Sequence, residues 1–349
     1  MILKNTKAIL KTPGTMEIRD AVTPIPKSDE VLIKVEYVGI CGSDVHGFES
    51  GPFIPPKDPN QEIGLGHECA GIVVSIGSNV TKFKEGDRVC IEPGVPCGKC
   101  RFCLEGKYNI CPEVDFMATQ PNYRGAFTNY LCHPEAFTYK LPDNMDTMEG
   151  ALVEPAAVGM HAALMAGAKP GKKIVILGAG CIGLMTLQAC IAMGAKEIIV
   201  VDIIDKRLAL AKELGAHEVI NAKKEDMLTR VYELLGDWGA DIVFETAGAQ
   251  VTAKQTPYLV MRGGKIMIVG TIPGETPINF LKINREVSIQ TVFRYANSYP
   301  TTIEAISSGK INVKSMVTDV YDYKDIQKAF EDSVYNREKM IKAVIKIND

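Results

Sequence analysis

The sequence predicts an α/β protein with two domains, a small β-rich domain and a doubly wound parallel sheet. With 349 residues, the chain exceeds the length at which one hydrophobic core usually divides. Short strand and turn signals fill roughly the first 155 residues. From residue 173 onward, apolar strand candidates alternate with helical segments, as in a parallel sheet with helices on its faces.

The β-rich part is predicted from alternating apolar residues and from turn residues. Residues 31–37 place apolar side chains at every second position, which indicates a half-buried strand. Residues 71–76 and 87–91 are expected to form further strands, with Gly77 and Gly86 in turns. Helix signals are few in this part.

The second part alternates strands and helices. We expect strands at 173–177, 198–202, 241–245 and 265–269, and helices at 182–193 and 205–214. The uncharged run 174–195 is long enough for a membrane span, but its three closely spaced glycines favour a buried strand, turn and helix. About 55 residues at the end of the chain do not continue the alternation of strands and helices. Periodicity alone leaves open whether they return to the first domain.

Composition excludes several classes of function. A net charge of −3 gives no electrostatic reason to bind nucleic acid or an anionic membrane. The N-terminus, MILKNTKAIL, lacks the continuous apolar segment of a signal peptide, so a cytoplasmic protein is expected. Ten cysteines in such a chain favour metal binding, catalysis or burial over disulfides.

Residues 178–183 read GAGCIG, a G-x-G-x-x-G motif that predicts a dinucleotide-binding turn. The motif is specific here because it follows a predicted strand and opens a predicted helix. Gly178 would allow the tight turn, and Gly180 would let the backbone approach a pyrophosphate. Gly183 would let the helix and the strand pack closely.

Asp202 ends the next predicted strand, 19 residues after the third glycine. Its carboxylate would accept hydrogen bonds from the adenosine ribose and repel the 2′-phosphate of NADP, which favours NAD. Arg207 leaves the choice open, because it could approach a 2′-phosphate or stack on the adenine.

Residues 97–111 read CGKCRFCLEGKYNIC and predict a structural zinc site. The spacing is C-x2-C-x2-C-x7-C, through Cys97, Cys100, Cys103 and Cys111. Four thiolates close a tetrahedral zinc shell and leave no open position. An iron–sulfur cluster is the rival, but ferredoxin spacing has three residues before the last cysteine, not seven. The basic patch beside the cysteines is too thin to favour a nucleic-acid-binding ribbon.

Two glycine-flanked polar clusters, GICGSDVH at 39–46 and GHE at 66–68, predict a catalytic metal centre. Catalytic zinc takes three protein ligands and keeps one open position, and Cys41 and His67 are a plausible pair.

The third ligand stays open between Glu68 and Glu154. Glu68 can share a metal with His67 only if the chain bends at Gly66, because neighbouring side chains on a strand point to opposite faces. Glu154 precedes Pro155, which favours an extended conformation for Glu154 at the entrance of a helix.

In this order, GICGSDVH, GHE, the four-cysteine segment, VEPAAVG and GAGCIG resemble the zinc-dependent medium-chain dehydrogenases over essentially the whole chain. The sorbitol (polyol) dehydrogenase branch is most similar, through IEPG at 91–94, KLPD at 140–143, ALVEP at 151–155 and FRYAN at 293–297. Alcohol dehydrogenases of this superfamily typically place a cysteine where VEP stands, so the carboxylate points to polyol-type enzymes. The resemblance implies a GroES-like catalytic domain at 1–155 and 297–349 and a Rossmann NAD-binding domain at 156–296.

The resemblance also implies roles for single residues. Cys41, His67 and Glu68 would hold the catalytic zinc, and Glu154 would bind the zinc water or the substrate and could exchange into the metal shell.

Ser43 would pass the alcohol proton onward and His46 would lead it to solvent, while Arg294 and Tyr295 would contact substrate hydroxyls. Further cofactor contacts would come from Ile182, Val269, Gly270, Thr271, Val292 and Phe293.

The expected activity is the NAD-dependent oxidation of a polyol to a ketose, similar to L-iditol 2-dehydrogenase, by a homotetramer with two zinc ions per chain. (R,R)-2,3-Butanediol dehydrogenase and L-threonine dehydrogenase are the enzymatic alternatives, and an inactive zinc- and NAD-binding protein is the alternative outside enzymes. Gly47 and Phe48 stand where the family often has a tyrosine after the relay histidine, which implies a roomier or less polar pocket.

Overall fold

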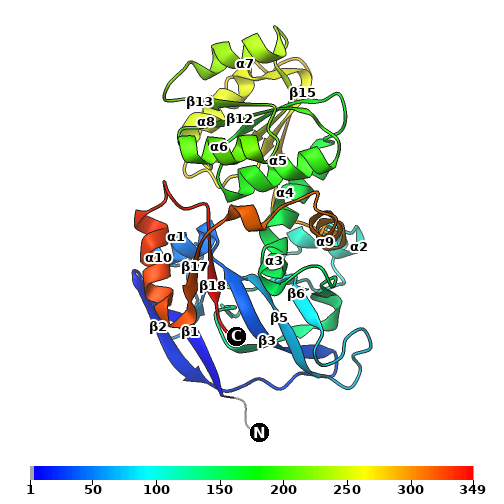
Figure 1. Cartoon of the computed structure of the whole chain (residues 1–349), viewed down its shortest axis with the longest axis vertical. Coiled ribbons are helices and arrows are strands. Elements are labelled where there is room, and N and C mark those ends of the chain that lie inside the picture. Colours follow the sequence, from blue (N-terminus) through cyan, green and yellow to red (C-terminus); the bar gives the residue numbers. More distant parts are fainter. Residues whose placement is uncertain (1–3, 349) are drawn as a thin grey trace. The chain divides into compact units, whose positions relative to one another are not determined.

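The computed structural model describes residues 4–348, which divide into two compact units (Figure 1). The first unit holds the residues up to 154, residues 299–307 and those from 313 onward. The second holds residues 155–298 and 308–312. The predicted domain boundaries, with one domain at 1–155 and 297–349 and the other at 156–296, stay a proposal. The structure differs from them in grouping residues 308–312 with the second unit.

A seven-stranded sheet forms the centre of the first unit. Its strands pair in the order β10-β6-β5-β3-β18-β17, and β9 also pairs with β3. The bounds are β3 Glu30–Gly39, β5 Glu68–Ile76, β6 Arg88–Ile91, β9 Tyr130–Pro134, β10 Thr138–Lys140, β17 Val317–Asp322 and β18 Lys342–Lys346. Apolar side chains of β3 and β5 pack with Phe127 and Phe330 in its core.

The end of the chain completes this sheet. Strand β18 lies antiparallel to β3, with Val344 opposite Gly39, and parallel to β17. Figure 1 shows the red strand β18 beside the blue strand β3. The C-terminal strands therefore belong to the first unit, a point that periodicity left open.

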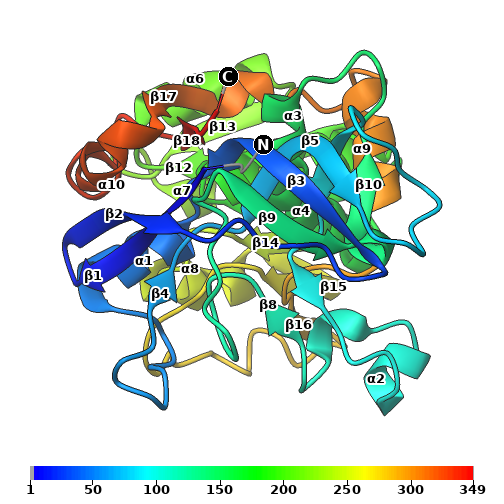
Figure 2. The same ribbon diagram turned by 90° about the horizontal axis from the view of Figure 1, so that it is seen from below.

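Smaller elements border the sheet. Strand β1 (Asn5–Thr12) forms a hairpin with β2 (Thr15–Ala21) and pairs with β4 (Ile63–Gly64). Strands β7 (Gly94–Val95) and β8 (Asp115–Phe116) form the base of the four-cysteine segment, which projects with α2 in Figure 2. The helices of this unit are α1 Gly42–Ser50, α2 Arg101–Leu104, α3 Thr147–Ala151, α9 Tyr299–Ser307 and α10 Ile326–Tyr335.

The second unit is a six-stranded parallel sheet with strand order β13-β12-β11-β14-β15-β16. Its strands are β11 Lys173–Leu177, β12 Glu197–Asp202, β13 Glu218–Asn221, β14 Ala240–Glu245, β15 Val260–Ile268 and β16 Ser288–Thr291. The helices between them are α5 Cys181–Ala192, α6 Asp205–Glu213, α7 Met227–Leu235 and α8 Gln250–Gln255, and α4 Val153–Ala166 precedes the sheet. The predicted alternation of strands and helices is confirmed.

The uncharged run at 174–195 forms β11, the glycine turn and α5, as predicted. Among residues 4–348, no helix is long and apolar enough to cross a membrane.

One helix was not predicted, and one local prediction is wrong. Residues 42–50 form helix α1, although helix signals are few in the first part of the sequence. Helix α4 begins at Val153, so Glu154 is helical rather than extended. Pro155 is accommodated because it lies in the first helical turn, where backbone N–H groups have no partner within the helix.

Candidate active site

The structure brings Cys41, His67 and Glu68 together in the first unit. Their possible ligand atoms all lie within 4.8 Å of one another. Cys41 precedes helix α1, and Glu68 begins strand β5, next to β3 in the sheet. Three residues of two sequence clusters thus converge on one buried position.

Gly66 provides the bend that lets His67 and Glu68 serve one site. Its φ angle is +89°, a left-handed conformation that disfavours other residues. A Cβ at this position would also lie 2.8 Å from the Phe127 ring. The bend at Gly66 that a shared site requires is therefore present. Cys69 is buried in β5 and is not part of this group.

Asp44 connects the segment of Cys41 with the segment of His67 through hydrogen bonds. Its carboxylate accepts hydrogen bonds from the amides of Cys41 (3.0 Å) and Gly66 (2.8 Å). Burial raises the pKa of Asp44, but the charge of His67 and these hydrogen bonds outweigh it and lower the pKa. The sequence analysis missed this residue, although a carboxylate three positions after Cys41 matches a helix-capping pattern.

The carboxylate of Glu68 is paired with a lysine from the last strand. Nζ of Lys342 donates to both oxygens of Glu68, at 2.6 and 2.7 Å, and to the carbonyl of Ile40 at 3.0 Å. The side chains of Lys342 and Glu68 are only 3% and 1% exposed. Gly39 leaves room for them, because a Cβ there would lie 1.9 Å from a Glu68 oxygen.

The electrostatics around His67 fit a bound cation. Nδ1 of His67 is buried without a hydrogen-bond partner, and Asp44 Oδ1 lies 3.6 Å away. Burial lowers the pKa of His67, but the charges of Asp44 and Cys41 outweigh it and hold the pKa well above its ordinary value. The site therefore favours a positive charge, and a zinc ion would take the place of the imidazole proton.

The four cysteines of the predicted structural site also converge. Cys97, Cys100, Cys103 and Cys111 place their sulfurs within 4.8 Å of one another, and none forms a disulfide. The separations of 3.4 Å from Cys100 to Cys103 and 3.9 Å from Cys97 to Cys103 fit the ~3.8 Å between sulfurs of a tetrahedral zinc shell. Amide hydrogen bonds from Lys99 and Cys100 lower the pKa of Cys97 to about 7, which favours the ligating thiolate.

The predicted relay residues share helix α1. Ser43 and His46 are three residues apart and so lie on one helical face, next to Cys41 at the start of the helix. Ser43 is exposed and His46 is half-buried.

Glu154 is buried in the first turn of α4 but is not part of the group formed by Cys41, His67 and Glu68. Its charge acts on Glu92, a buried carboxyl that the sequence analysis used only as part of the IEPG pattern. Burial raises the pKa of Glu92 to about 7, and Glu154 adds to the rise, while hydrogen bonds from Tyr108 and Tyr139 oppose it.

The glycine turn of the second unit has the form that the motif predicts. Gly178 has φ +107°, and a Cβ on Gly183 would lie 1.9 Å from the carbonyl of Gly178. A Cβ on Gly180 would meet nothing within 4 Å, so this glycine leaves open space where α5 begins. The N-terminus of a helix favours a bound pyrophosphate through its dipole and its backbone N–H groups.

Asp202 at the end of β12 also supports this turn. Its carboxylate accepts hydrogen bonds from the amide of Ala179 at 2.6 Å and from those of Ile203 and Ile204 at 2.7 and 3.0 Å. Arg207 lies half-buried in the first turns of α6.

The other predicted cofactor and substrate residues follow strands at the same edge. Parallel strands direct their carboxyl ends to one edge of the sheet. Val269, Gly270 and Thr271 follow β15, while Val292, Phe293, Arg294 and Tyr295 follow β16; Ile182 lies in the first turn of α5. Buried Glu245, at the end of β14, was missed; it accepts hydrogen bonds from Ala247 and Thr252.

The two predicted substrate contacts differ in exposure. Arg294 has φ +53°, and its guanidinium lies 4.7 Å above the ring of Phe293. Tyr295 is only 2% exposed, so it offers little surface to a substrate in this conformation. Their roles stay predictions.

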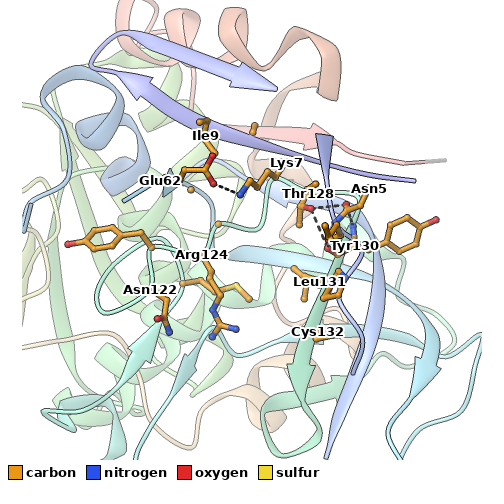
Figure 3. Close-up of a pocket in the computed structure, with 18 of the residues that line it drawn as sticks. Asn5, Lys7, Ile9, Glu62, Asn122, Arg124, Thr128, Tyr130, Leu131 and Cys132 are labelled. Carbon is orange, nitrogen blue, oxygen red and sulfur yellow. Dashed lines mark hydrogen bonds and ion pairs between the residues drawn. The ribbon is translucent and has the colours of Figure 1, made fainter. Parts of the chain in front are cut away.

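A cavity of about 630 Å³ in the first unit contains none of the predicted site residues (Figure 3). Its cationic residues are already paired, Lys7 with Glu62 and Arg124 with Asp115. We assign this cavity no role.

Two family models match the chain. The model described as an alcohol dehydrogenase GroES-like domain matches residues 27–143, and the model described as a zinc-binding dehydrogenase matches residues 181–308.

Relatives match almost the whole chain. An uncharacterized zinc-type alcohol dehydrogenase-like protein, YdjJ of Escherichia coli, is 77% identical over 99% of this chain and 100% of its own. Sorbitol dehydrogenase of Bacillus subtilis is 42% identical over 95% of each chain. The crystal structure of an E. coli oxidoreductase of unknown specificity superposes with a TM-score of 0.99 at 76% identity, over 99% of this chain and 100% of that one.

Replacing Lys342 by Met should destabilise the zinc-free protein more than the zinc-loaded protein. Without the ammonium, the Glu68 carboxylate is buried with no counter-charge, a change that costs about 3–5 kcal/mol. Denaturant unfolding of both forms measures the effect. Lys140→Met is the control, because Lys140 is 54% exposed and its pair with Asp87 should contribute under about 1 kcal/mol. Equal losses in the two variants would contradict the prediction.

Replacing Cys103 by Ser should remove one of two zinc ions per chain, because a hydroxyl is a poor substitute for a thiolate. Elemental analysis of the purified protein measures the zinc content. Cys132→Ser, outside both ligand groups, should retain both ions. Two zinc ions in Cys103→Ser would rule out the four-cysteine site.

Replacing Glu92 by Gln should reduce the decrease in unfolding free energy that accompanies a rise in pH. The pKa of Glu92 is raised from 4.5 to about 7, so the folded state binds this proton more tightly than the unfolded chain. Its stabilising effect is full below pH 4.5 and is lost as the pH rises through about 7, by up to ~3 kcal/mol. Unfolding free energies from about pH 5.5 to 8 measure the slope. Exposed Glu85→Gln is the control, and an unchanged slope in Glu92→Gln would contradict the assignment.

Proposed function

Because the chain belongs to the zinc-dependent medium-chain dehydrogenases, in the sorbitol (polyol) dehydrogenase branch, we propose that it oxidises a secondary alcohol of a polyol to a ketose with NAD. The observation that carries the proposal is the buried group of Cys41, His67 and Glu68 at the start of the helix that bears Ser43 and His46. The name of the sorbitol dehydrogenase relative supports a polyol as the substrate.

Residues of the first unit would bind the metal and transfer the proton in this reaction. When bound, zinc would supply a Lewis acid for the alcohol oxygen, and NAD would supply the hydride acceptor. Cys41, His67 and Glu68 would hold the ion. Ser43 would take the hydroxyl proton and His46 would release it to solvent. The carbinol hydrogen leaves with its electron pair, so the products are a ketose, NADH and one proton.

The charges of the ligands suit this chemistry. One thiolate and one carboxylate would leave the zinc site formally neutral, whereas two thiolates would weaken the Lewis acid. Glu154 would bind the substrate or the water on the zinc, and it would exchange into the metal shell when Glu68 is held by Lys342.

Asp202 supports NAD rather than NADP as the cofactor. Its carboxylate would repel a 2′-phosphate at the end of β12. Arg207, in the next helix, is the residue that could reverse this preference.

An exposed strand edge supports a homo-oligomer, which we propose to be a cytoplasmic tetramer. Strand β16 ends the sheet order, and all four of its residues are exposed. Ile289 in this strand and Phe280 and Leu281 in the chain before it expose large apolar side chains. Open edges with apolar neighbours favour pairing with another chain.

An initial-rate panel tests the proposal. Zinc-loaded protein is offered sorbitol, xylitol, other polyols, 2,3-butanediol and threonine, each with NAD and with NADP, before and after chelation. We expect polyols with NAD to react fastest and chelation to abolish the reaction. Faster turnover of butanediol or threonine would shift the substrate assignment, and chelator-resistant turnover would remove zinc from the chemistry.

Glu154→Gln in the same assay tests the second glutamate. It should lower kcat at least about tenfold without a matching loss of stability, because a carboxamide carries no charge for the metal or the proton. Normal rates would remove Glu154 from the mechanism.

A further inference from the structure

His46 is covered by an aromatic ring from the loop that follows α1. The rings of His46 and Phe53 are 3.8 Å apart between centroids and inclined by 9°, a face-to-face stack. One face of the imidazole is therefore covered. The stack leaves the two ring nitrogens, which make hydrogen bonds in the plane of the ring, at the uncovered edge.

Core packing does not explain Phe53. The residue is 59% exposed, and its neighbour Ile54 is 55% exposed. Phe48, on the same helix as His46, is by contrast buried at 4% and stacks on Phe330. Phe48 therefore belongs to the core, and Phe53 is the aromatic residue that His46 contacts.

The loop holds Phe53 in this place. Helix α1 ends at Ser50. The next residue, Gly51, turns the chain with a φ of +85°, and its amide donates to the carbonyl of Gly47 at 2.8 Å. The hydroxyl of buried Tyr123 donates to the carbonyl of Ile54 at 2.5 Å. At the far end of the loop, Gln61 donates to the carbonyl of Asn122 at 3.1 Å. The segment of Tyr123 thus fixes the turn that carries the phenyl ring.

We propose that Phe53 is a positioning residue for proton release: its ring fixes the imidazole plane of His46 so that one nitrogen receives the proton and the other delivers it to solvent. This inference rests on the proposed function. A histidine that is free to rotate must find the productive orientation at every turnover, whereas a stacked ring is already oriented.

The structure of the stack is tested first, without activity. In ¹H–¹³C spectra of the zinc-loaded protein, the ring signals of His46 are identified by their loss in His46→Gln. A face-on phenyl ring shifts these signals upfield. Phe53→Leu should move them downfield, while Phe53→Tyr, which keeps the ring, and Ile54→Ala, the exposed neighbour, should leave them in place. Unmoved signals in Phe53→Leu overturn the proposal.

Proton release is then timed by stopped flow, with a pH indicator and NADH absorbance followed together in a single turnover. In the wild type, both signals should rise at one rate. In Phe53→Leu, proton release should lag behind NADH about five- to tenfold, and Phe53→Tyr should restore it. If the His46 signals move in Phe53→Leu but proton release does not lag behind NADH formation, the proposal is overturned. A wild type that oxidises no alcohol instead contradicts the proposed function, and the wild-type trace shows this before any variant is compared.

Discussion

The buried ion pair between Lys342 and Glu68 joins the last strand of the chain to the residue next to His67. A buried ammonium and a buried carboxylate each need the other, because either alone would be costly to remove from water. The pair therefore fixes β18 against β3 and β5, closes the sheet of the first unit, and sets the position of a candidate metal ligand. Fold and site depend on the same contact.

The same pair shapes the candidate metal centre. Cys41, Asp44 and Glu68 bring three acidic groups around His67, and Lys342 balances one of them. The remaining charge holds the pKa of His67 well above its ordinary value, which is the electrostatic signature of a site for a cation. A zinc ion must share the Glu68 carboxylate with Lys342, and this gives Glu154 a reason to act as the alternative ligand.

Local patterns predicted much of the fold and of the candidate site. Strand periodicity located β11 and β12, the glycine motif gave the turn at Gly178, and cysteine spacing gave a group that the structure brings together. Contacts between distant segments could not be predicted, because no local pattern records them. Lys342 lies 274 residues from Glu68. In the sequence, Phe53 looks like an ordinary loop residue. Only the folded chain, with the hydrogen bond from Tyr123 to Ile54, brings its ring onto that of His46.

The metal centre itself is tested most directly by anomalous X-ray diffraction from crystals of the zinc-loaded protein at the zinc absorption edge. The account predicts two anomalous peaks per chain. One should lie at ~2.3 Å from the four sulfurs of Cys97, Cys100, Cys103 and Cys111, and the other should be bonded to Cys41, His67 and Glu68. The absence of an anomalous peak beside Cys41 and His67 would contradict it.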